Sequence, residues 1–322
     1  MVYPHDRVGD DMPAPVKLLV VSQHAEAFRQ LLHNAALPNL EVRAAPDPAQ
    51  ALPHCDAAQV LFGAPDMLVP LLDHCPHLQW VQSSWAGIRP LIDAPRRDYR
   101  LTGVRDIFGR TMAEYVLAWI LAFRRDVLSR ANARHWDDSP NGSVQGQIIG
   151  IAGTGSIGAE VARFCQSFGM QTRGLNTAGT PTENFDRCYD SSSITTFATH
   201  LDYLVALLPD TPDTDGIINH SVLDALNPGA VLINAGRGNS IHYPDMFRAL
   251  QRGQLGRAVL DVFPEEPLPQ SDPLWQMENV TITSHTAAPT STTAIVDIFC
   301  QNYSRFQAGD VLLNEIDFNQ GY

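Results

Sequence analysis

The sequence predicts an α/β protein made of two doubly wound parallel-sheet domains. Its 322 residues exceed what one domain of roughly 100–200 residues usually contains. Short apolar segments typical of buried strands alternate with amphipathic segments typical of helices, and this alternation favours β-α-β units. A glycine-rich turn at residues 153–158 joins one such strand to one such helix, as expected where a second β-α series begins.

The first hundred residues contain the first series. Strands are expected at residues 17–22, 60–62 and 78–82, and helices at 25–35 and 66–74. The longest helical pattern of the chain follows at residues 111–125, where apolar side chains recur near the 3.6-residue period.

The second series begins after residue 147. Apolar runs predict strands at residues 148–152, 171–175, 203–207, 230–234, 257–260 and 280–283. Helical patterns occur at residues 157–168, 221–226, 243–252 and 292–306. We therefore expect a discontinuous first domain, residues 1–107 and 290–322, with a second domain, residues 108–289, inserted in it.

Composition and charge exclude several classes of protein. Hydrophobic residues make up 44% and charged residues 18%, a balance typical of a globular chain and too apolar for a disordered one. The formal net charge of −13 disfavours binding to nucleic acid. The longest purely apolar run, residues 115–123, is far short of the ~20 residues of a membrane helix, so we expect no membrane association.

Cysteine usage indicates a cytoplasmic protein. The five cysteines are an odd number without a repeating spacing, which favours reduced thiols. His74, Cys75 and His77 lie close together, but this spacing is weak evidence for zinc. We expect no metal site.

The turn at residues 153–158 has the G-x-G-x-x-G pattern in the context that binds a dinucleotide, after an apolar strand and before a helix. Gly153 permits the tight turn, Gly155 lets the backbone approach a pyrophosphate, and Gly158 lets the helix pack closely on the strand. The pyrophosphate then lies at the helix N-terminus, where free N–H groups favour an anion. The predicted cofactor-binding residues of this turn are Gly153, Thr154, Gly155, Ser156 and Ile157.

The residue at the end of the next strand distinguishes NAD from NADP. An acidic side chain there would bind the adenosine ribose and repel a 2′-phosphate. This chain has Asn176 followed by Thr177 at that position. The absence of negative charge favours NADP(H) modestly over NAD(H).

Three polar side chains follow predicted strands near the end of the second series. Arg237 follows the strand at residues 230–234, and Glu266 follows the one at 257–260. His285 follows the strand at 280–283. Open α/β sheets bind ligands outside the carboxyl ends of their strands, so we expect these side chains to form one site.

At these residues the sequence resembles the D-2-hydroxyacid dehydrogenase family, and is most similar to its glyoxylate/hydroxypyruvate reductase A branch. The similarity extends over roughly residues 101–322. It is carried, in the family's order, by the segments TMAEYVLAWILAFRR, GTGSIG, LLPDTPDTDGIIN, LINAGRGNSIH, AVLDVFPEEPLP, SDPLW and VTITSH. The first hundred residues match mainly through residues 84–88. The chain departs from the family pattern at Arg89, Asn176 and Ser284.

The resemblance implies a Rossmann nucleotide domain inserted in a flavodoxin-like substrate domain, with the active site in the cleft between them. It implies that Arg237 binds the substrate carboxylate and carbonyl through its planar fork. His285 is the implied acid/base, since imidazole titrates near neutral pH, and Glu266 orients it. The implied substrate-binding residues are Trp85, Ala86, Gly87 and Arg237. Further implied cofactor contacts are Asn176, Thr177, Leu207, Leu208, Pro209, Thr214, Ala235, Gly236 and Asp261, the last near the nicotinamide carboxamide.

The implied function is NAD(P)H-dependent reduction of small 2-oxo acids, glyoxylate and hydroxypyruvate, to 2-hydroxy acids, in a cytoplasmic homodimer. Two alternatives stay open. The substrate is instead a bulkier or phosphorylated acid, or the protein is a dinucleotide-sensing, corepressor-like binding protein. The lack of a partner-docking extension in the sequence argues against the corepressor.

Overall fold

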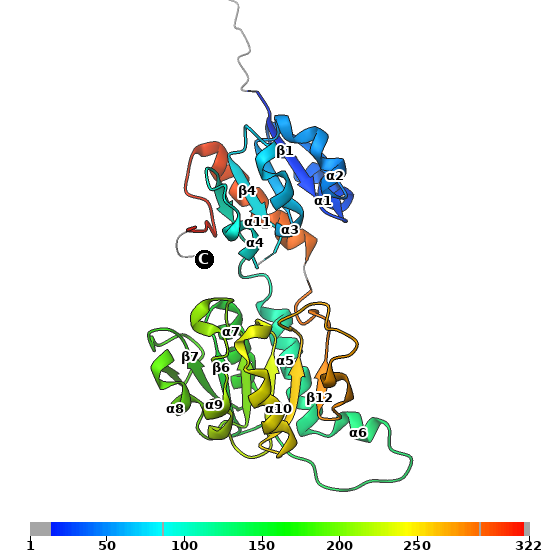
Figure 1. The fold of residues 1–322 in the computed structure, drawn as a ribbon, viewed down its shortest axis with the longest axis vertical. Helices are drawn as coiled ribbons and strands as arrows, with labels where there is room; N and C mark the ends of the chain where they lie inside the picture. The colour runs from blue at the N-terminus through cyan, green and yellow to red at the C-terminus, as the bar shows by residue number, and fades with distance from the viewer. Residues whose placement is uncertain (1–13, 86, 290, 319–322) are drawn as a thin grey trace, which may run out of the picture. The chain divides into compact units, whose positions relative to one another are not determined.

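The computed structural model describes residues 14–85, 87–289 and 291–318. The chain divides into two compact units (Figure 1). Unit 1 consists of Met1–Ile107 with Thr290–Tyr322, and unit 2 of Phe108–Pro289. Each unit contains a fully parallel sheet with helices on both faces, which confirms the predicted fold class.

The sheet of unit 1 has five strands in the order β2-β1-β3-β4-β5. This is the strand order of flavodoxin-type doubly wound sheets. All four neighbouring pairs are parallel. The strands are β1 (Val16–Val21), β2 (Leu40–Ala45), β3 (Val60–Gly63), β4 (Trp80–Ser83) and β5 (Arg100–Thr102).

Helices cover both faces of the unit 1 sheet because successive strand side chains point to opposite sides. One face packs against α1 (Ala25–Asn34) and α11 (Thr292–Ala308). The other packs against short helical segments after the strands, namely α2 (Pro48–Ala51), α3 (Pro65–Leu68), α4 (Arg89–Asp93) and the 3-10 turns Leu52–Ala57 and Val69–His74.

Helix α11 completes the core of unit 1 although it comes near the end of the chain, and Figure 1 shows it lying across the sheet. Phe299 of α11 is fully buried. Its ring stacks on Phe62 of β3 at 5.2 Å and on Trp80 of β4 at 5.0 Å between centroids. The Trp80 indole N–H donates to Thr102 Oγ1 at 2.8 Å. The core around the strands that are translated first therefore depends on a helix that is translated near the end of the chain.

The sheet of unit 2 has seven strands in the order β12-β11-β10-β9-β6-β7-β8. Counted from β6, this is the dinucleotide-binding order 3-2-1-4-5-6 with one more strand at the far edge. The strands are β6 (Ile148–Ala152), β7 (Gln171–Leu175), β8 (Arg187–Tyr189), β9 (Tyr203–Ala206), β10 (Ala230–Asn234), β11 (Leu255–Leu260) and β12 (Val280–Ile282).

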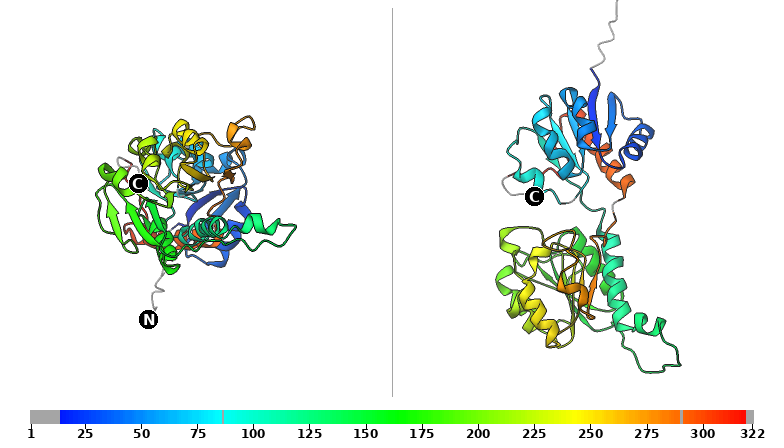
Figure 2. Two further views of the ribbon diagram at one scale, coloured as in Figure 1. Left: turned by 90° about the horizontal axis from the view of Figure 1, so that it is seen from below. Right: turned by 45° about the vertical axis from the view of Figure 1, so that its right-hand side comes forward.

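Two layers of helices enclose the unit 2 sheet. Helices α5 (Gly109–Arg124) and α7 (Ser156–Ser167) pack on one face, and Figure 2 shows α5 running along it. The opposite face is covered by α8 (Ile194–Ala198), α9 (His220–Ala225) and α10 (Tyr243–Gln251). A short helix, α6 (Val127–Ala131), follows α5. No helix in the described part of the chain is long and apolar enough to span a membrane.

One predicted helix differs from the structure. The single helix expected at residues 66–74 is instead α3, which ends at Leu68, followed by a 3-10 turn over Val69–His74. Pro70 explains the change, because it has no N–H to donate to the carbonyl of Asp66. Strands β2, β5 and β8 are additional to those predicted.

Candidate active site

The predicted catalytic side chains follow three neighbouring strands of unit 2. Arg237 comes after β10, Glu266 after β11 and His285 after β12. These strands are adjacent and parallel. Their carboxyl ends therefore meet at one edge of the sheet, which is where this fold class binds ligands.

Direct contacts join the loops after β10 and β11. A Cβ atom added at Gly238 would lie 2.0 Å from the carbonyl carbon of Phe263, so only glycine lets these backbones approach so closely. The Phe263 N–H donates to Glu266 Oε1 at 2.9 Å. The loop that carries Arg237 therefore packs against the loop that fixes Glu266.

The loops after β11 and β12 are joined by the proposed acid/base pair. His285 Nδ1 lies 2.8 Å from Glu266 Oε2. The His285 side chain is 57% exposed and the Glu266 side chain 35%, so the pair is open to a ligand. Because Nδ1 faces the carboxylate, the other ring nitrogen, Nε2, is the one left to exchange a proton with a substrate.

His285 has an unusual backbone conformation, with φ of +54°. A non-glycine residue in this left-handed region costs about 1–2 kcal/mol. Asp261, at the end of β11, holds it there: its carbonyl accepts the His285 N–H at 2.8 Å. The Asp261 carboxylate also accepts the N–H groups of Thr286 at 2.9 Å and Ala287 at 3.0 Å. One buried residue thus fixes the backbone on both sides of the imidazole ring.

Arg237 carries the positive charge of the site. Its Nη1 donates to the Gly236 carbonyl at 2.7 Å, which fixes the direction of the guanidinium. Among the residues that the structure describes, no carboxylate forms an ion pair with Arg237. A guanidinium without a protein counter-ion is suited to bind a carboxylate in a bidentate manner.

The glycine-rich turn has the shape that a pyrophosphate requires. Gly153 has φ of +105°, and an added Cβ there would lie 2.6 Å from the Leu207 carbonyl oxygen. At Gly158 the added Cβ would lie 2.0 Å from the Gly153 carbonyl oxygen. At Gly155 it would meet nothing within 4 Å. Two glycines therefore serve the packing of the turn, and Gly155 leaves open space.

Helix α7 begins at this open space. Its N-cap is Gly155, and no side chain caps the helix. Unpaired N–H groups and the positive end of the helix dipole then face outward, and both favour a phosphate. The turn consequently fits a dinucleotide on grounds of space and charge. Ser156 is exposed at the helix start and Ile157 packs into the core.

The end of β7 is neutral and well hydrogen-bonded. Asn176 Nδ2 donates to Thr154 Oγ1 at 3.1 Å and to the Thr180 carbonyl at 2.8 Å, and its Oδ1 accepts the Thr180 N–H. Thr177 is exposed. The guanidinium of Arg173 donates to the carbonyls of Phe197 and Thr199 instead. The position therefore holds neither an acid nor a free cation.

The other predicted cofactor contacts lie around β9 and β10. Leu208 and Ala235 are buried. Gly236 packs against Leu207, since an added Cβ would lie 2.9 Å from the Leu207 Cα. Thr214 Oγ1 donates to the Pro209 carbonyl at 2.7 Å and so closes the turn after β9. These residues shape the sheet edge, and their contact with a cofactor stays a prediction.

The predicted substrate loop belongs to unit 1. Trp85 follows β4, and its side chain is 47% exposed. The Trp85 N–H donates to Ser83 Oγ at 3.0 Å. Ala86 lies outside the described residues, and Gly87 is half-buried. Substrate binding by this loop stays a prediction.

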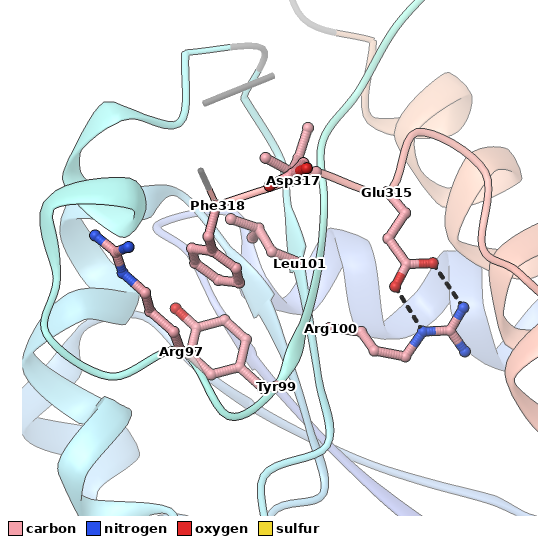
Figure 3. A pocket seen from close by; sticks show the side chains of 8 residues that line it. Arg97, Tyr99, Arg100, Leu101, Glu315, Asp317 and Phe318 are labelled. Carbon is pink, nitrogen blue, oxygen red and sulfur yellow. Dashed lines mark hydrogen bonds and ion pairs between the residues drawn. The ribbon is translucent and has the colours of Figure 1, made fainter. Parts of the chain in front are cut away.

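A cavity of about 450 Å³ lies in unit 1, and none of the predicted site residues lines it (Figure 3). It is lined by β5, the residues before it and the segment after α11. Arg100 and Glu315 form a bidentate ion pair there, with distances of 2.9 and 2.7 Å. Within the described ranges, no cluster of three metal-binding side chains occurs, and Cys75 is fully buried.

Comparisons with known proteins agree with this architecture. The family model described as "D-isomer specific 2-hydroxyacid dehydrogenase, NAD binding domain" matches residues 117–287. A solved D-isomer specific 2-hydroxyacid dehydrogenase family protein from Aeromonas salmonicida is 38% identical, with a TM-score of 0.90, over 95% of this chain and 100% of that chain.

Two further solved structures contain a bound dinucleotide. A D-isomer specific 2-hydroxyacid dehydrogenase from Xanthobacter autotrophicus, in complex with NADPH and MES, is 26% identical with a TM-score of 0.84, over 96% of this chain and 100% of that chain. An NADPH-dependent glyoxylate/hydroxypyruvate reductase from Sinorhizobium meliloti, in complex with NADP and sulfate, is 28% identical with a TM-score of 0.84. The match covers 95% of this chain and 100% of that chain. This chain belongs to the D-isomer specific 2-hydroxyacid dehydrogenase family, as the sequence motifs indicated.

Sequence reasoning missed two residues near this site. Tyr115 of α5 and Thr283 after β12 are joined through their hydroxyl groups at 2.8 Å, and Thr283 donates to Asp261. Tyr115 was part of the apolar pattern of its helix, and Thr283 was the last residue of a predicted strand. No spacing in the sequence connects them, because 168 positions separate them.

Proposed function

We propose that this protein reduces small 2-oxo acids, glyoxylate and hydroxypyruvate, to 2-hydroxy acids with NAD(P)H, and that His285 is the acid/base. The observation that carries the proposal is the His285–Glu266 contact of 2.8 Å on the sheet edge that also holds Arg237. These three groups suit carbonyl reduction: the imidazole can donate a proton, the carboxylate can orient the imidazole, and the guanidinium can bind the carboxylate of the substrate.

The side chains have distinct roles in this reaction. Arg237 binds the substrate carboxylate and polarises the carbonyl at C2. The reduced dinucleotide, when bound, supplies the hydride to C2. His285 donates its Nε2 proton to the oxygen that becomes the hydroxyl. Glu266 holds Nδ1 in a hydrogen bond, so that the ring presents Nε2 to the substrate oxygen.

The cofactor is proposed to be NADP(H) in preference to NAD(H). The support is Asn176, whose neutral side chain is committed to Thr154 and Thr180. No carboxylate stands there to repel a 2′-phosphate. The relatives from Xanthobacter and Sinorhizobium were crystallised with NADPH and NADP, which supports the same choice.

We further propose a cytoplasmic homodimer. The five cysteines are all free in the structure, as in a reducing compartment. The segment after α5 exposes large apolar side chains: Val127 is 49% exposed, Leu128 50% and Trp136 91%. Apolar side chains that are exposed in one protomer can be covered in an interface, and the family resemblance makes a second copy of this chain the expected partner.

The proposal is tested by a steady-state screen of 2-oxo acids with NADPH and with NADH, following loss of reduced-nicotinamide absorbance. The panel contains glyoxylate, hydroxypyruvate, pyruvate, bulkier 2-oxo acids and phosphorylated ones. Highest kcat/KM for glyoxylate or hydroxypyruvate with NADPH supports it. Preference for a bulkier or phosphorylated acid overturns the substrate assignment, and equal rates with both dinucleotides overturn the cofactor preference. Dinucleotide binding without turnover of any acid favours the corepressor-like alternative.

Matched variants test the site. His285→Ala should lower kcat by about 10²–10⁴-fold and leave dinucleotide affinity unchanged. Glu266→Gln should also lower kcat, whereas Glu265→Gln, an exposed carboxylate next to it in sequence, should not. His33→Ala, an exposed histidine of α1, controls for loss of an imidazole. A His285→Ala variant that turns over like wild type overturns the acid/base assignment.

A further inference from the structure

We infer that Tyr115 and Thr283 are positioning residues, which hold the His285 loop in its working conformation through the carboxylate of Asp261. The inference rests on the proposed function, because His285 must be the proton donor for its position to govern turnover. It adds two side chains that touch neither substrate nor dinucleotide in the proposed reaction.

Asp261 is 1% exposed, and within the described part of the chain it accepts hydrogen bonds only from the segment after β12. Its Oδ1 accepts the Thr283 hydroxyl and the Thr286 N–H at 2.9 Å, and its Oδ2 accepts the Ala287 N–H at 3.0 Å. The three donors come from both sides of His285. The orientation of one carboxylate therefore decides whether the backbone at residue 285 can stay in its left-handed conformation.

The hydroxyl chain has a fixed direction. Thr283 has one hydroxyl proton, and it is donated to Asp261 Oδ1. The proton in the 2.8 Å contact between Tyr115 and Thr283 must therefore come from Tyr115. Burial raises the pKa of Tyr115 to about 12, so its phenol keeps this proton throughout the neutral range. Tyr115 thus holds the Thr283 oxygen in place while Thr283 donates to the carboxylate.

These hydrogen bonds connect the loop after β12 to α5, which packs on one face of the unit 2 sheet. Tyr115 belongs to α5, whose neighbouring ring Trp119 packs edge-on against it at 6.3 Å between centroids. Without the Thr283 donor, the buried carboxylate of Asp261 loses one of its three partners. A buried carboxylate that loses a donor is less well stabilised, so we expect its hydrogen bonds to the N–H groups of Thr286 and Ala287 to weaken.

The chain offers well-matched variants for a test. Thr283→Val removes the hydroxyl with little change in shape, and Thr283→Ser restores it. Tyr115→Phe removes the outer hydroxyl only. Thr281→Val is the control, because Thr281 lies in β12, two residues before Thr283, and its hydroxyl makes no hydrogen bond to any residue that the structure describes. Tyr99→Phe controls for loss of a buried phenol, since the Tyr99 hydroxyl has no hydrogen-bond partner among the described residues.

Two readouts are measured on the full-length protein. The first is amide hydrogen exchange by mass spectrometry over residues 283–287, which needs no substrate. The second is kcat for the best 2-oxo acid, together with the Kd for NADPH alone. Thr283→Val should speed exchange in this segment and lower kcat by about 10-fold or more. Thr283→Ser should restore most of the protection from exchange and most of kcat. Tyr115→Phe should reduce each of them by less than Thr283→Val does.

The double variant tests the serial order of the chain. If Tyr115 acts only through Thr283, then Tyr115→Phe added to Thr283→Val should cost no further activity, whereas independent effects would multiply. Unchanged exchange and kcat in Thr283→Val, or losses equal to those of Thr281→Val, overturn the inference. If Thr283→Val fails to fold, Tyr115→Phe decides by the same two measurements. A wild-type protein without 2-oxo acid reductase activity refutes the proposed function instead, and the exchange measurement still tests the anchoring of the loop.

Discussion

Substitution of Gly155 by alanine should weaken dinucleotide binding while leaving the stability of the free protein nearly unchanged. Gly155 is the N-cap of α7, with φ of −64° and ψ of −174°, a conformation open to any residue. An added Cβ meets no atom within 4 Å. Gly→Ala gains about 0.4–1 kcal/mol by restricting the unfolded chain, and alanine is a poorer N-cap by a similar amount.

The expected effect appears on addition of NADPH. The methyl group occupies the space in which a pyrophosphate would approach the backbone. At a ligand concentration of about 100 Kd, binding stabilises the wild type by ~2.7 kcal/mol, which for a domain of ~150–250 residues raises Tm by about 5–11 °C. A tenfold weaker complex retains ~1.4 kcal/mol, or about 3–6 °C. Thermal unfolding with and without NADPH measures the difference.

Gly158→Ala is the contrasting variant. Its Cβ would lie 2.0 Å from the Gly153 carbonyl oxygen, so the backbone of α7 must shift. Overpacking of this kind costs about 1–3 kcal/mol, and the free protein itself should melt earlier. If Gly155→Ala binds NADPH as tightly as the wild type, the pyrophosphate does not lie at this turn and our interpretation of the glycine pattern is wrong.

Three other outcomes are expected. Phe299→Ala should destabilise unit 1 by about 3–5 kcal/mol in urea unfolding, because it removes the buried ring that stacks on β3 and β4; a loss below ~1 kcal/mol would contradict the role of α11 in the core. Hydrogen bonds from Arg100 lower the pKa of Glu315, so their stabilisation exists above the ordinary carboxyl pKa of 4.5 and is lost as pH falls through the folded-state value. Arg100→Ala should accordingly lower the free energy of unfolding by under about 1 kcal/mol at neutral pH. In acid, the difference in unfolding free energy between the variant and the wild type should disappear. Burial raises the pKa of Cys165 to about 12, so a thiol reagent followed by mass spectrometry should label half-buried Cys188 well before it.

Much of the fold could be predicted from the sequence because central strands are buried on both faces. Runs such as residues 230–234 are then almost wholly apolar, and β10 is buried at every position. The three unpredicted strands, β2, β5 and β8, all lie at sheet edges. Their sequences, LEVRAA, RLT and RCY, carry little apolar signal, because an edge strand is defined chiefly by pairing with its neighbour.

The site was predictable to the extent that it follows from topology. Residues placed after parallel strands must meet at one sheet edge, which is why Arg237, Glu266 and His285 could be expected together from the sequence. The family resemblance implied the pairing of Glu266 with His285, and the structure brings these two to 2.8 Å. The left-handed backbone of His285 and the donors to Asp261 could not be predicted. They depend on the orientation of one buried side chain, and hydrophobic periodicity contains no information about that.

The dependence of unit 1 on α11 has a consequence for synthesis on the ribosome. Strands β1–β5 emerge first, but the ring of Phe299 that covers β3 and β4 is translated only after all of unit 2. At ~5–20 residues per second, that interval is about 10–40 s. Unit 2, being continuous, can fold within it. The nascent N-terminal segment meanwhile keeps an uncovered apolar face, which is the kind of surface that chaperones bind, so the part of the enzyme that is made first is finished last.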